Sequence, residues 1–423
     1  PTSTIEEVTP TPPPAPTPET PPQPTPAEQK CEASSVSDET GTEFQKGSKG
    51  VGDPYFPGLG NGGYDVDRYL IDVTWQPGDG YLDGWTTIEA KTTENLSSFN
   101  VDLNANMAVS EVIVNGEEAC FIREGNEVTV VPATNLPVGS EFEARFGYAG
   151  VPGLVPAEYA PVGAGGWYHE PIEGGGGVYS VPNTMFVVGE PSSSMAWHPV
   201  NDHPRDRAQF RIEMTVNNGR YDFAFVDWEF VTNGFLISKE EITSPQGFPV
   251  TTWIYETRYP QAPYLTVLAY GAFIASDEED LGDVTLQHWV DPYSYNFEGS
   301  DAFTILREQQ GVDYGLMLET FTDLFGPYPY DTYGYLALRH PQFAFALETQ
   351  TLSIFMNFKT WYEPYIHVHE LAHQWFGNYI TVDNWSEIWL NEGFATYSEY
   401  LYNEATRPTY DIYAGMRDLE AQS

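Results

Sequence analysis

The chain is poor in cysteine and has no long apolar run. Only Cys31 and Cys120 occur among its 423 residues, and their spacing does not resemble that of a zinc site. They form either one disulfide, which would suit an oxidising compartment, or two free thiols, and the sequence leaves both possibilities open. No apolar run reaches the roughly 18 residues that a membrane-spanning helix requires, so no transmembrane segment is expected.

Basic residues are also scarce. The chain has 18 Lys and Arg against 61 Asp and Glu, which gives a formal net charge of −43 at pH 7. Such a chain would repel a polyanion, so nucleic acid is excluded as a partner. High negative charge favours solubility, and the shortage of Lys fits either a salt-rich setting or an ordinary acidic exported protein.

Proline and threonine dominate the beginning of the chain. Residues 1–30 contain 11 Pro and 7 Thr and almost nothing apolar, so we expect a disordered, extended linker over residues 1–50. The chain shows no initial Met and no apolar signal core, so we expect any signal peptide to have been removed or to lie outside it. The linker predicts an exported protein that is extracellular or tethered to the cell surface.

The composition changes near residue 50 and again near residue 274. Between them, short alternating apolar segments separated by Gly, Pro and Asn-Gly turns predict an antiparallel β domain over residues 51–273. Its Gly-rich stretch 163–177 lacks the context of a phosphate-binding loop and is expected to be an ordinary loop. From residue 274 to 423 the pattern predicts a mixed domain. We expect it to have a strand over 284–290, a helical segment near 301–325, further strands to about 358 and two later helices.

The run His369-Glu370-Leu371-Ala372-His373 carries the chemistry. Residues four apart lie on one helix face, so His369 and His373 can bind one metal ion, with Glu370 beside it as a base for water. Glu392 follows 19 residues after His373 and supplies a third ligand from a second helix. Three protein ligands and one open position are typical of catalytic zinc, so one Zn²⁺ per chain is predicted.

Several segments resemble the aminopeptidase N family of zinc metallopeptidases, the gluzincin aminopeptidases. The similarity is strongest in two segments, HELAHQWFGN (369–378) and WSEIWLNEGFATY (385–397), and extends to three others (190–207, 251–273 and 325–330). The resemblance implies an α+β multidomain fold, in which a saddle-like antiparallel β domain precedes a thermolysin-like zinc catalytic domain. It also implies removal of N-terminal residues from peptides, with Glu370 activating a zinc-bound water.

The resemblance further implies a site for the substrate's free N-terminus. The family's exopeptidase motif aligns with Phe345-Ala346-Leu347-Glu348-Thr349, which retains the glutamate but changes its neighbours. Glu348 would bind the α-ammonium group by a charge-assisted hydrogen bond. Glu190 aligns with a second amine-binding glutamate, and Ala346 is assigned to substrate binding with them.

One family feature is not matched within the chain. A tyrosine that stabilises the transition state is expected roughly 60 residues after the third ligand, as the resemblance implies, whereas this sequence stops at Ser423, so the catalytic domain is expected to be truncated. Two alternatives stay open beside an aminopeptidase. One is another zinc hydrolase on the same scaffold, either an endopeptidase or an epoxide hydrolase, and the other is a non-catalytic peptide-binding fragment. The sequence does not indicate an oligomeric state.

Overall fold

The structure is a computed structural model that describes residues 31, 36–37, 43–155, 165–169, 184–217, 228–291, 302–308, 310–338, 345–356 and 358–420. Every structural statement below concerns these residues. The Pro/Thr-rich part of the predicted linker, residues 1–30, lies outside them.

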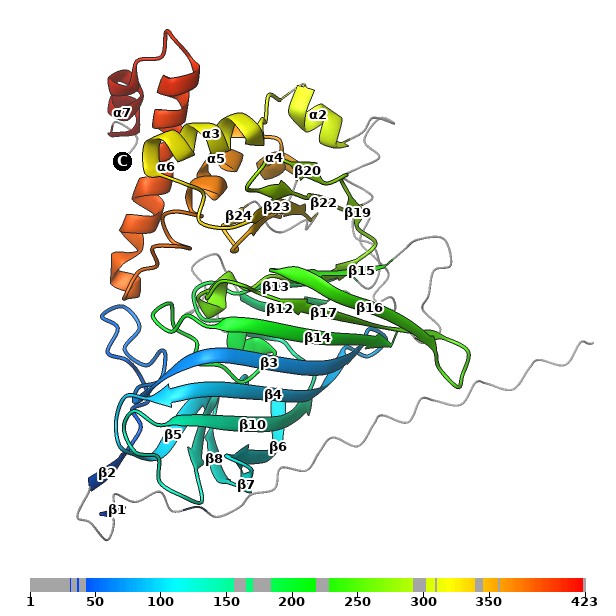
Figure 1. The fold of residues 1–423 in the computed structure, drawn as a ribbon, viewed down its shortest axis with the longest axis vertical. Helices are drawn as coiled ribbons and strands as arrows, with labels where there is room; N and C mark the ends of the chain where they lie inside the picture. Colours follow the sequence, from blue (N-terminus) through cyan, green and yellow to red (C-terminus); the bar gives the residue numbers. More distant parts are fainter. Residues whose placement is uncertain are drawn as a thin grey trace, which may run out of the picture.

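A large twisted sheet forms the base of the molecule (Figure 1). Side chains alternate between buried and exposed along its strands, as a half-buried strand requires, and Tyr69, Ile71, Val73 and Trp75 of one strand face the core. The strand order is β16-β17-β14-β3-β4-β10-β6-β7. The strands are β3 (Tyr64–Gln76), β4 (Tyr81–Thr92), β6 (Met107–Val114), β7 (Glu117–Glu118), β10 (Glu141–Gly150), β14 (Gln209–Asn217), β16 (Phe235–Thr243) and β17 (Pro249–Glu256).

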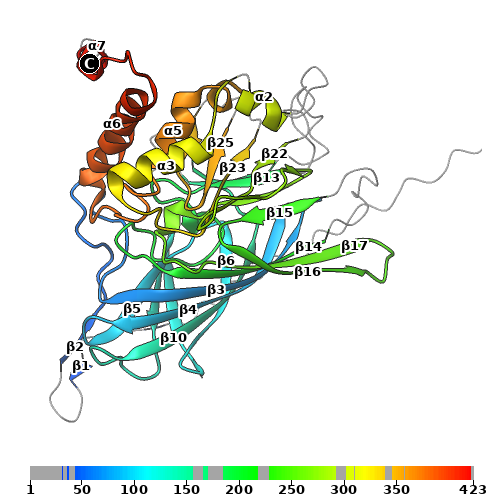
Figure 2. The same cartoon turned by 45° about the horizontal axis from the view of Figure 1, so that its top comes forward.

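Two five-stranded sheets complete the β region. One has the order β1-β2-β5-β9-β8 and the other β11-β12-β13-β18-β15. The second of these lies between the large sheet and the helical region (Figure 2). Their strands are β1 (Val36–Ser37), β2 (Glu43–Lys46), β5 (Leu96–Asp102), β8 (Cys120–Glu124), β9 (Glu127–Val131), β11 (Leu154–Val155), β12 (Gly165–His169), β13 (Met185–Val188), β15 (Glu229–Thr232) and β18 (Leu268–Gly271).

The antiparallel prediction holds for most strand pairs of this region, but two are parallel. β14 runs parallel to β3, with Ile212 opposite Ile71, and β2 runs parallel to β5. The two strands of the first pair are separated by well over a hundred residues. Local alternation predicts a strand but contains no information on its partner, so the sequence could not show this pairing.

The structure corrects the predicted linker and the predicted Gly-rich loop, and it shows whether the two cysteines are bonded. The predicted linker 1–50 is too long, because β2 joins the sheet and buries Phe44. The predicted loop 163–177 contains β12, which pairs with β13 and buries Trp167. The rest of that stretch lies outside the described residues. Cys31 and Cys120 form a disulfide, with their Cα atoms 5.8 Å apart.

The helical region is built on a mixed sheet centred on β23 (Thr332–Ala337). β23 is parallel to three neighbours, and the edge strands are antiparallel. The strand expected over 284–290 is two short strands, interrupted at residues 287–288. The neighbours and edges are β19 (Ile274–Ala275), β20 (Glu279–Asp280), β21 (Thr285–Leu286), β22 (Trp289–Val290), β24 (Ala346–Leu347) and β25 (Leu352–Phe355).

The helices pack beside this sheet (Figure 2). α3 illustrates why they form: Asp313 accepts the backbone N–H of Leu316 as an N-cap, Met317 and Phe321 are buried, and Gly326 ends the helix at φ +96°. The helical segment expected near residues 301–325 consists of two helices in the structure. They are α2 (Ala302–Glu308) and α3 (Tyr314–Phe325), and α4 (Phe358–Trp361), α5 (Pro364–Ala372), α6 (Ile388–Thr406) and α7 (Ile412–Glu420) follow.

The β region and the helical region share apolar contacts. One buried cluster joins Val188 and Val267 of the β region to Leu336 and Ile354 of the mixed sheet. A smaller cluster joins Leu265 and its neighbours to Trp385, just before α6. Among the described residues, the helices are all too short or too polar to cross a membrane.

Candidate metal and peptide site

Two histidines at the end of α5 face the same space. Pro364 occupies the first turn of α5, where its missing N–H costs nothing, and the helix continues to Ala372. His373 follows as the C-cap with helical backbone angles, and its N–H donates to the carbonyl of His369 at 3.2 Å. The two rings are therefore one helical turn apart, with centroids separated by 4.7 Å.

Glu392 approaches both rings from α6. Its Oε2 lies 3.2 Å from His369 Nε2, and its Oε1 lies 3.7 Å from His373 Nε2. In the described part of the chain, only two sets of three residues bring potential ligand atoms within 4.8 Å of one another. His369, His373 and Glu392 form one set, and Glu348, Glu370 and His373 form the other. The three predicted metal ligands are therefore brought together.

Each histidine is oriented by a second contact at Nδ1. His369 Nδ1 lies 2.8 Å from Glu399 Oε1, and His373 Nδ1 lies 3.0 Å from the carbonyl oxygen of Phe376. With Nδ1 engaged in this way, Nε2 of each ring is left to face Glu392; histidines that bind a metal are commonly oriented by such a contact at the other ring nitrogen. Glu399 was not predicted from the sequence. Its position seven residues after Glu392, on the same face of α6, was the signal that could have identified it.

Glu370 lies next to the three predicted metal ligands and is buried. Only 5% of the surface of Glu370 is exposed, and its Oε2 has no hydrogen-bond partner among the described residues. Burial raises the pKa of Glu370 well above its usual range, the charge of His369 opposes this, and the nearby carboxylates add to it. A buried carboxylate without a partner requires a cation or a proton, so this atom is a candidate contact for a bound cation or for a transferred proton.

Glu348 lies close to Glu370 and His373, and two side chains bind its backbone carbonyl group. Gln374 Nε2 and Asn378 Nδ2 donate to its carbonyl oxygen at 3.2 and 2.6 Å. Its side chain is almost fully buried, and its Oε1 has no hydrogen-bond partner within the described residues. Burial, with the charge of Glu392, raises the pKa of Glu348 to about 7. A glutamate facing solvent would not have this environment.

Glu190 completes the group of carboxylates, two residues after the end of β13. Burial raises its pKa well above the usual range, and the charges of Glu348, Glu392 and Glu370 raise it further. Ala346 lies on β24, opposite Phe355, two residues before Glu348 in the chain. The hydroxyl of Tyr264 is buried, and Glu348 and Glu190 raise its pKa beyond the effect of burial. Tyr264 was not predicted from the sequence as part of the site.

His367, which lies two residues before His369, is a packing residue. His367 is fully buried, stacks on Phe355 at 4.2 Å, and hydrogen-bonds Tyr314 Oη at 2.5 Å and the carbonyl of Trp361 at 2.7 Å. Burial lowers its pKa to about 4, so it is neutral near pH 7. His340 lies outside the described residues.

Without a metal ion, the pKa of His369 is raised and the pKa of His373 is lowered. Burial disfavours charge on His369, but hydrogen bonds to Glu392 and Glu399 outweigh it and raise its pKa to about 10. For His373, burial and the charge of His369 lower the pKa to about 4. Without a metal ion, the proton on His369 therefore supplies the positive charge that pairs with Glu392 and Glu399.

The C-terminal part of the chain, from residue 314 onward, matches a family model. Residues 314–423 match the "Peptidase family M1 domain". The chain is 28% identical over 228 residues to aminopeptidase N of Oryctolagus cuniculus. That alignment covers 51% of this chain and 22% of the relative, so this chain corresponds to only a part of that protein.

Solved structures match over most of the chain. An M1 zinc metallopeptidase from Deinococcus radiodurans superposes with a TM-score of 0.71 at 29% sequence identity. The match covers 88% of this chain and 77% of that one. A mutant of that enzyme bound to a Tyr-Ser-Ala substrate matches with a TM-score of 0.70 at 28% identity, over 88% of this chain and 78% of the other.

Proposed function

We propose that this chain, which is similar to M1 zinc metallopeptidases over most of its length, is a member of the aminopeptidase N (M1) family and a zinc-dependent aminopeptidase that removes N-terminal residues from peptides. One observation carries the proposal. Two buried carboxylates, Glu348 and Glu370, each have an oxygen without a partner among the described residues, and both lie beside the His369, His373 and Glu392 set. A metal ion held by His369, His373 and Glu392 would offset the charge of the nearby Glu370, and the ammonium group of a peptide would pair with Glu348.

The donor set fits zinc. Two imidazole nitrogens and one carboxylate are the ligands of catalytic zinc, which keeps a further position open. When bound, zinc would polarise the scissile carbonyl and make a water molecule more acidic. His369, His373 and Glu392 would hold it, and Glu399 and the Phe376 carbonyl would keep the imidazole rings in place.

Glu370 is proposed as the general base and acid. Its buried carboxyl has a raised pKa, as a group that first accepts and then returns a proton requires. It would take a proton from the attacking water and deliver it to the leaving amine.

Glu348 and Glu190 are proposed to bind the substrate's N-terminal ammonium. An ammonium between these carboxylates would neutralise charge that burial makes costly. Because Glu348 and the metal ligands share His373 as a neighbour, only a short segment of substrate fits between the anchor and the scissile bond. Cleavage would therefore be restricted to the first peptide bond.

The test is hydrolysis of a panel of aminoacyl-chromophore substrates by the zinc-loaded chain, with each substrate also prepared in N-acetylated form. The proposal predicts turnover of the free amines and loss of at least about 90% of it on acetylation, since acetylation removes the cation that Glu348 binds. Equal turnover of both forms would indicate an endopeptidase. No turnover of either, with zinc bound, would indicate a peptide-binding fragment.

Replacing Glu348 with Gln is expected to raise KM for free-amine substrates by about 10- to 100-fold, since a hydrogen bond to a charged group contributes about 1.5–3 kcal/mol. The value of kcat should change less. Glu404→Gln, an exposed change of the same chemistry on α6, is the matched control and should leave KM unchanged. An unchanged KM in Glu348→Gln would exclude it as the amine anchor.

Zinc binding at pH 8 is expected to release at least one proton per ion. The pKa of His369 is raised to about 10 in the metal-free site, so His369 is protonated at pH 8 and must lose that proton to become a ligand. Zinc affinity should consequently increase as the pH rises toward 10. Calorimetric titrations in buffers of different ionisation enthalpy measure the proton count, and a count of zero would contradict this description of the site.

We also propose that the protein is exported. The Cys31–Cys120 disulfide supports an oxidising compartment, because such bonds are rare in reducing ones. Mass spectrometry of the protein isolated from its source, alkylated before reduction, would find no free thiol if this is correct.

A further inference from the structure

The helix that carries Glu392 begins against the β region. A short 3-10 helix, η7 (Trp385–Glu387), leads directly into α6, and Glu392 follows Trp385 by seven residues. Asn384 and Glu387 are the N-cap residues of η7 and α6, and neither makes a capping side-chain bond to the described residues. The first N–H groups of such a segment need acceptors from elsewhere. Figure 2 shows the segment before β3 beside this end of α6.

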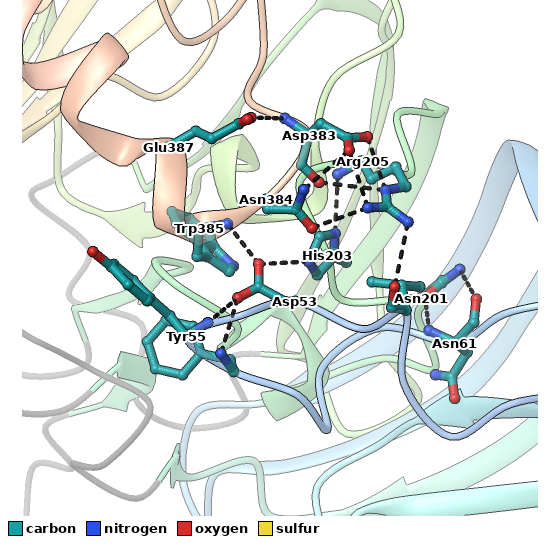
Figure 3. Close-up of polar contacts among 12 residues, drawn as sticks. Asp53, Tyr55, Asn61, Asn201, His203, Arg205, Asp383, Asn384, Trp385 and Glu387 are labelled. Atoms are coloured by element: carbon teal, nitrogen blue, oxygen red, sulfur yellow. Dashed lines mark hydrogen bonds and ion pairs between the residues drawn. The ribbon is translucent and has the colours of Figure 1, made fainter.

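Asp53, from that segment, supplies the acceptor (Figure 3). Its Oδ2 accepts the backbone N–H of Trp385 at 2.5 Å, across 332 residues of sequence. Its Oδ1 accepts the N–H groups of Tyr55 and Phe56 at 2.7 and 2.9 Å, which fixes the carboxylate in its own loop. The side chain is fully buried, and a carboxylate at a helix N-terminus also interacts favourably with the helix dipole.

His203 holds Asp53 from the other side. Its Nε2 lies 3.2 Å from Asp53 Oδ2, and its Nδ1 accepts the backbone N–H of Arg205 at 3.3 Å. Because Nδ1 is an acceptor, Nε2 carries the proton and donates to Asp53. Burial lowers the pKa of His203, which agrees with a neutral ring.

Arg205 binds Asp383 and Asn384, the two residues before Trp385. Its guanidinium group contacts the Asp383 carboxylate at 2.9 Å, the Asp383 carbonyl at 3.3 Å and Asn384 Oδ1 at 3.0 Å (Figure 3). Asp383 in turn donates its N–H to Glu387 Oε2 at 3.3 Å. The turn before α6 is therefore bound through three consecutive residues, 383 to 385.

The ring of Trp385 connects this turn to the peptide site. It packs edge-on against Tyr264 at 5.1 Å and lies in a buried cluster with Leu59 and Leu265 of the β region. Tyr264 is the residue whose hydroxyl lies near Glu348 and Glu190. The start of α6 and the amine-binding carboxylates thus rest on the same part of the β region.

We propose that Asp53, His203 and Arg205 form an interdomain clasp whose role is to position the zinc ligand Glu392. The three are positioning residues, since they act through the residues 383–385 and touch neither metal nor substrate. Because Glu392 is half-exposed and enters the site from α6 alone, its place depends on where that helix begins. The inference rests on the proposed zinc site and is independent of peptidase activity.

The test is the rate of zinc release into excess chelator, measured for the full chain and three variants that are all folded at the assay temperature. Asp53→Asn and Arg205→Ala each weaken the clasp, and Arg205 is partly exposed, so its removal leaves the β core intact. Arg258→Ala is the matched control. It removes another arginine of the β region that pairs with an aspartate of the helical region, Asp331, at 2.5 Å and away from α6.

We expect zinc release to be about tenfold faster in Asp53→Asn and Arg205→Ala, at the lower end of the effect of partners beyond the metal's own ligands. Arg258→Ala should release zinc at the unaltered rate. Equal release in all four proteins, or equal acceleration in the control, would overturn the clasp. A merely structural role would lower the melting temperature without changing the release rate. If the unaltered chain binds no zinc, the proposed function itself fails, which is a separate outcome.

Discussion

Replacing Glu370 with Gln is expected to lower kcat/KM by about 10³- to 10⁴-fold, with zinc still bound. General acid–base catalysis contributes up to about 10⁴-fold, and Gln has nearly the same shape but can neither accept nor return a proton. Because Glu370 is not one of the three proposed ligands, the metal should remain. Hydrolysis of an aminoacyl-chromophore substrate and the zinc content of the same sample are measured together.

The control for this result is Glu404→Gln, which makes the same chemical change at an exposed position of α6 and should retain full activity. If Glu370→Gln keeps more than about a tenth of the activity, the proton is transferred by another group. If it loses zinc as well, Glu370 is a ligand, and the second carboxylate set, with Glu348 and His373, holds the metal instead.

Replacing Glu392 with Ala is expected to weaken zinc binding by about 10²- to 10³-fold. Apparent binding energies of about 10–16 kcal/mol at four-ligand zinc sites correspond to about 2.5–4 kcal/mol for each ligand. The chain should keep its fold, since the Glu392 side chain is half-exposed and the start of its helix is held by Trp385 and Ile388 in a buried cluster. Competition with a chromogenic chelator measures the affinity.

Glu404→Ala on the same helix is the reference for any general effect of losing a glutamate. Its affinity for zinc should equal that of the unaltered chain. An unchanged affinity in Glu392→Ala would show that the carboxylate next to both imidazole rings is not a ligand.

The cluster of proposed zinc ligands was predictable because its geometry is local. His369 and His373 are four residues apart, so one helix places both on one face, and the structure does so in the last turn of α5. Glu392 was predictable from its spacing and from the apolar flanks that resemble a known family. Glu370 and Glu348 were identified in the same way, although only the structure shows that both carboxylates are buried.

The contacts that orient these residues were not predictable. Asp53 reaches Trp385 across 332 residues, and nothing in either segment alone indicates the other. The same applies to Gln374 and Asn378, whose side chains hold the Glu348 backbone, and to Tyr264. A single sequence shows which side chains could perform chemistry, but the partner of a buried polar group depends on how distant segments pack.

For the fold, too, local features were predicted from the sequence and contacts between distant segments were not. Alternation and turn residues indicated the strands of the β region, and the two-region organisation agrees with the matched M1 structures. The parallel pairing of β14 with β3 and the strand β12 inside the Gly-rich stretch were missed. In the first case the partner is distant, and in the second the turn residues concealed a strand buried through Trp167.

The most direct measurement is X-ray diffraction from zinc-loaded crystals at energies on both sides of the zinc absorption edge. One anomalous peak per chain is expected, about 2.0–2.2 Å from His369 Nε2, His373 Nε2 and a Glu392 carboxylate oxygen. Glu370 should lie close to the peak without coordinating it. A peak among Glu348, Glu370 and His373, or a zinc-loaded chain with no peak near His369, would contradict the account.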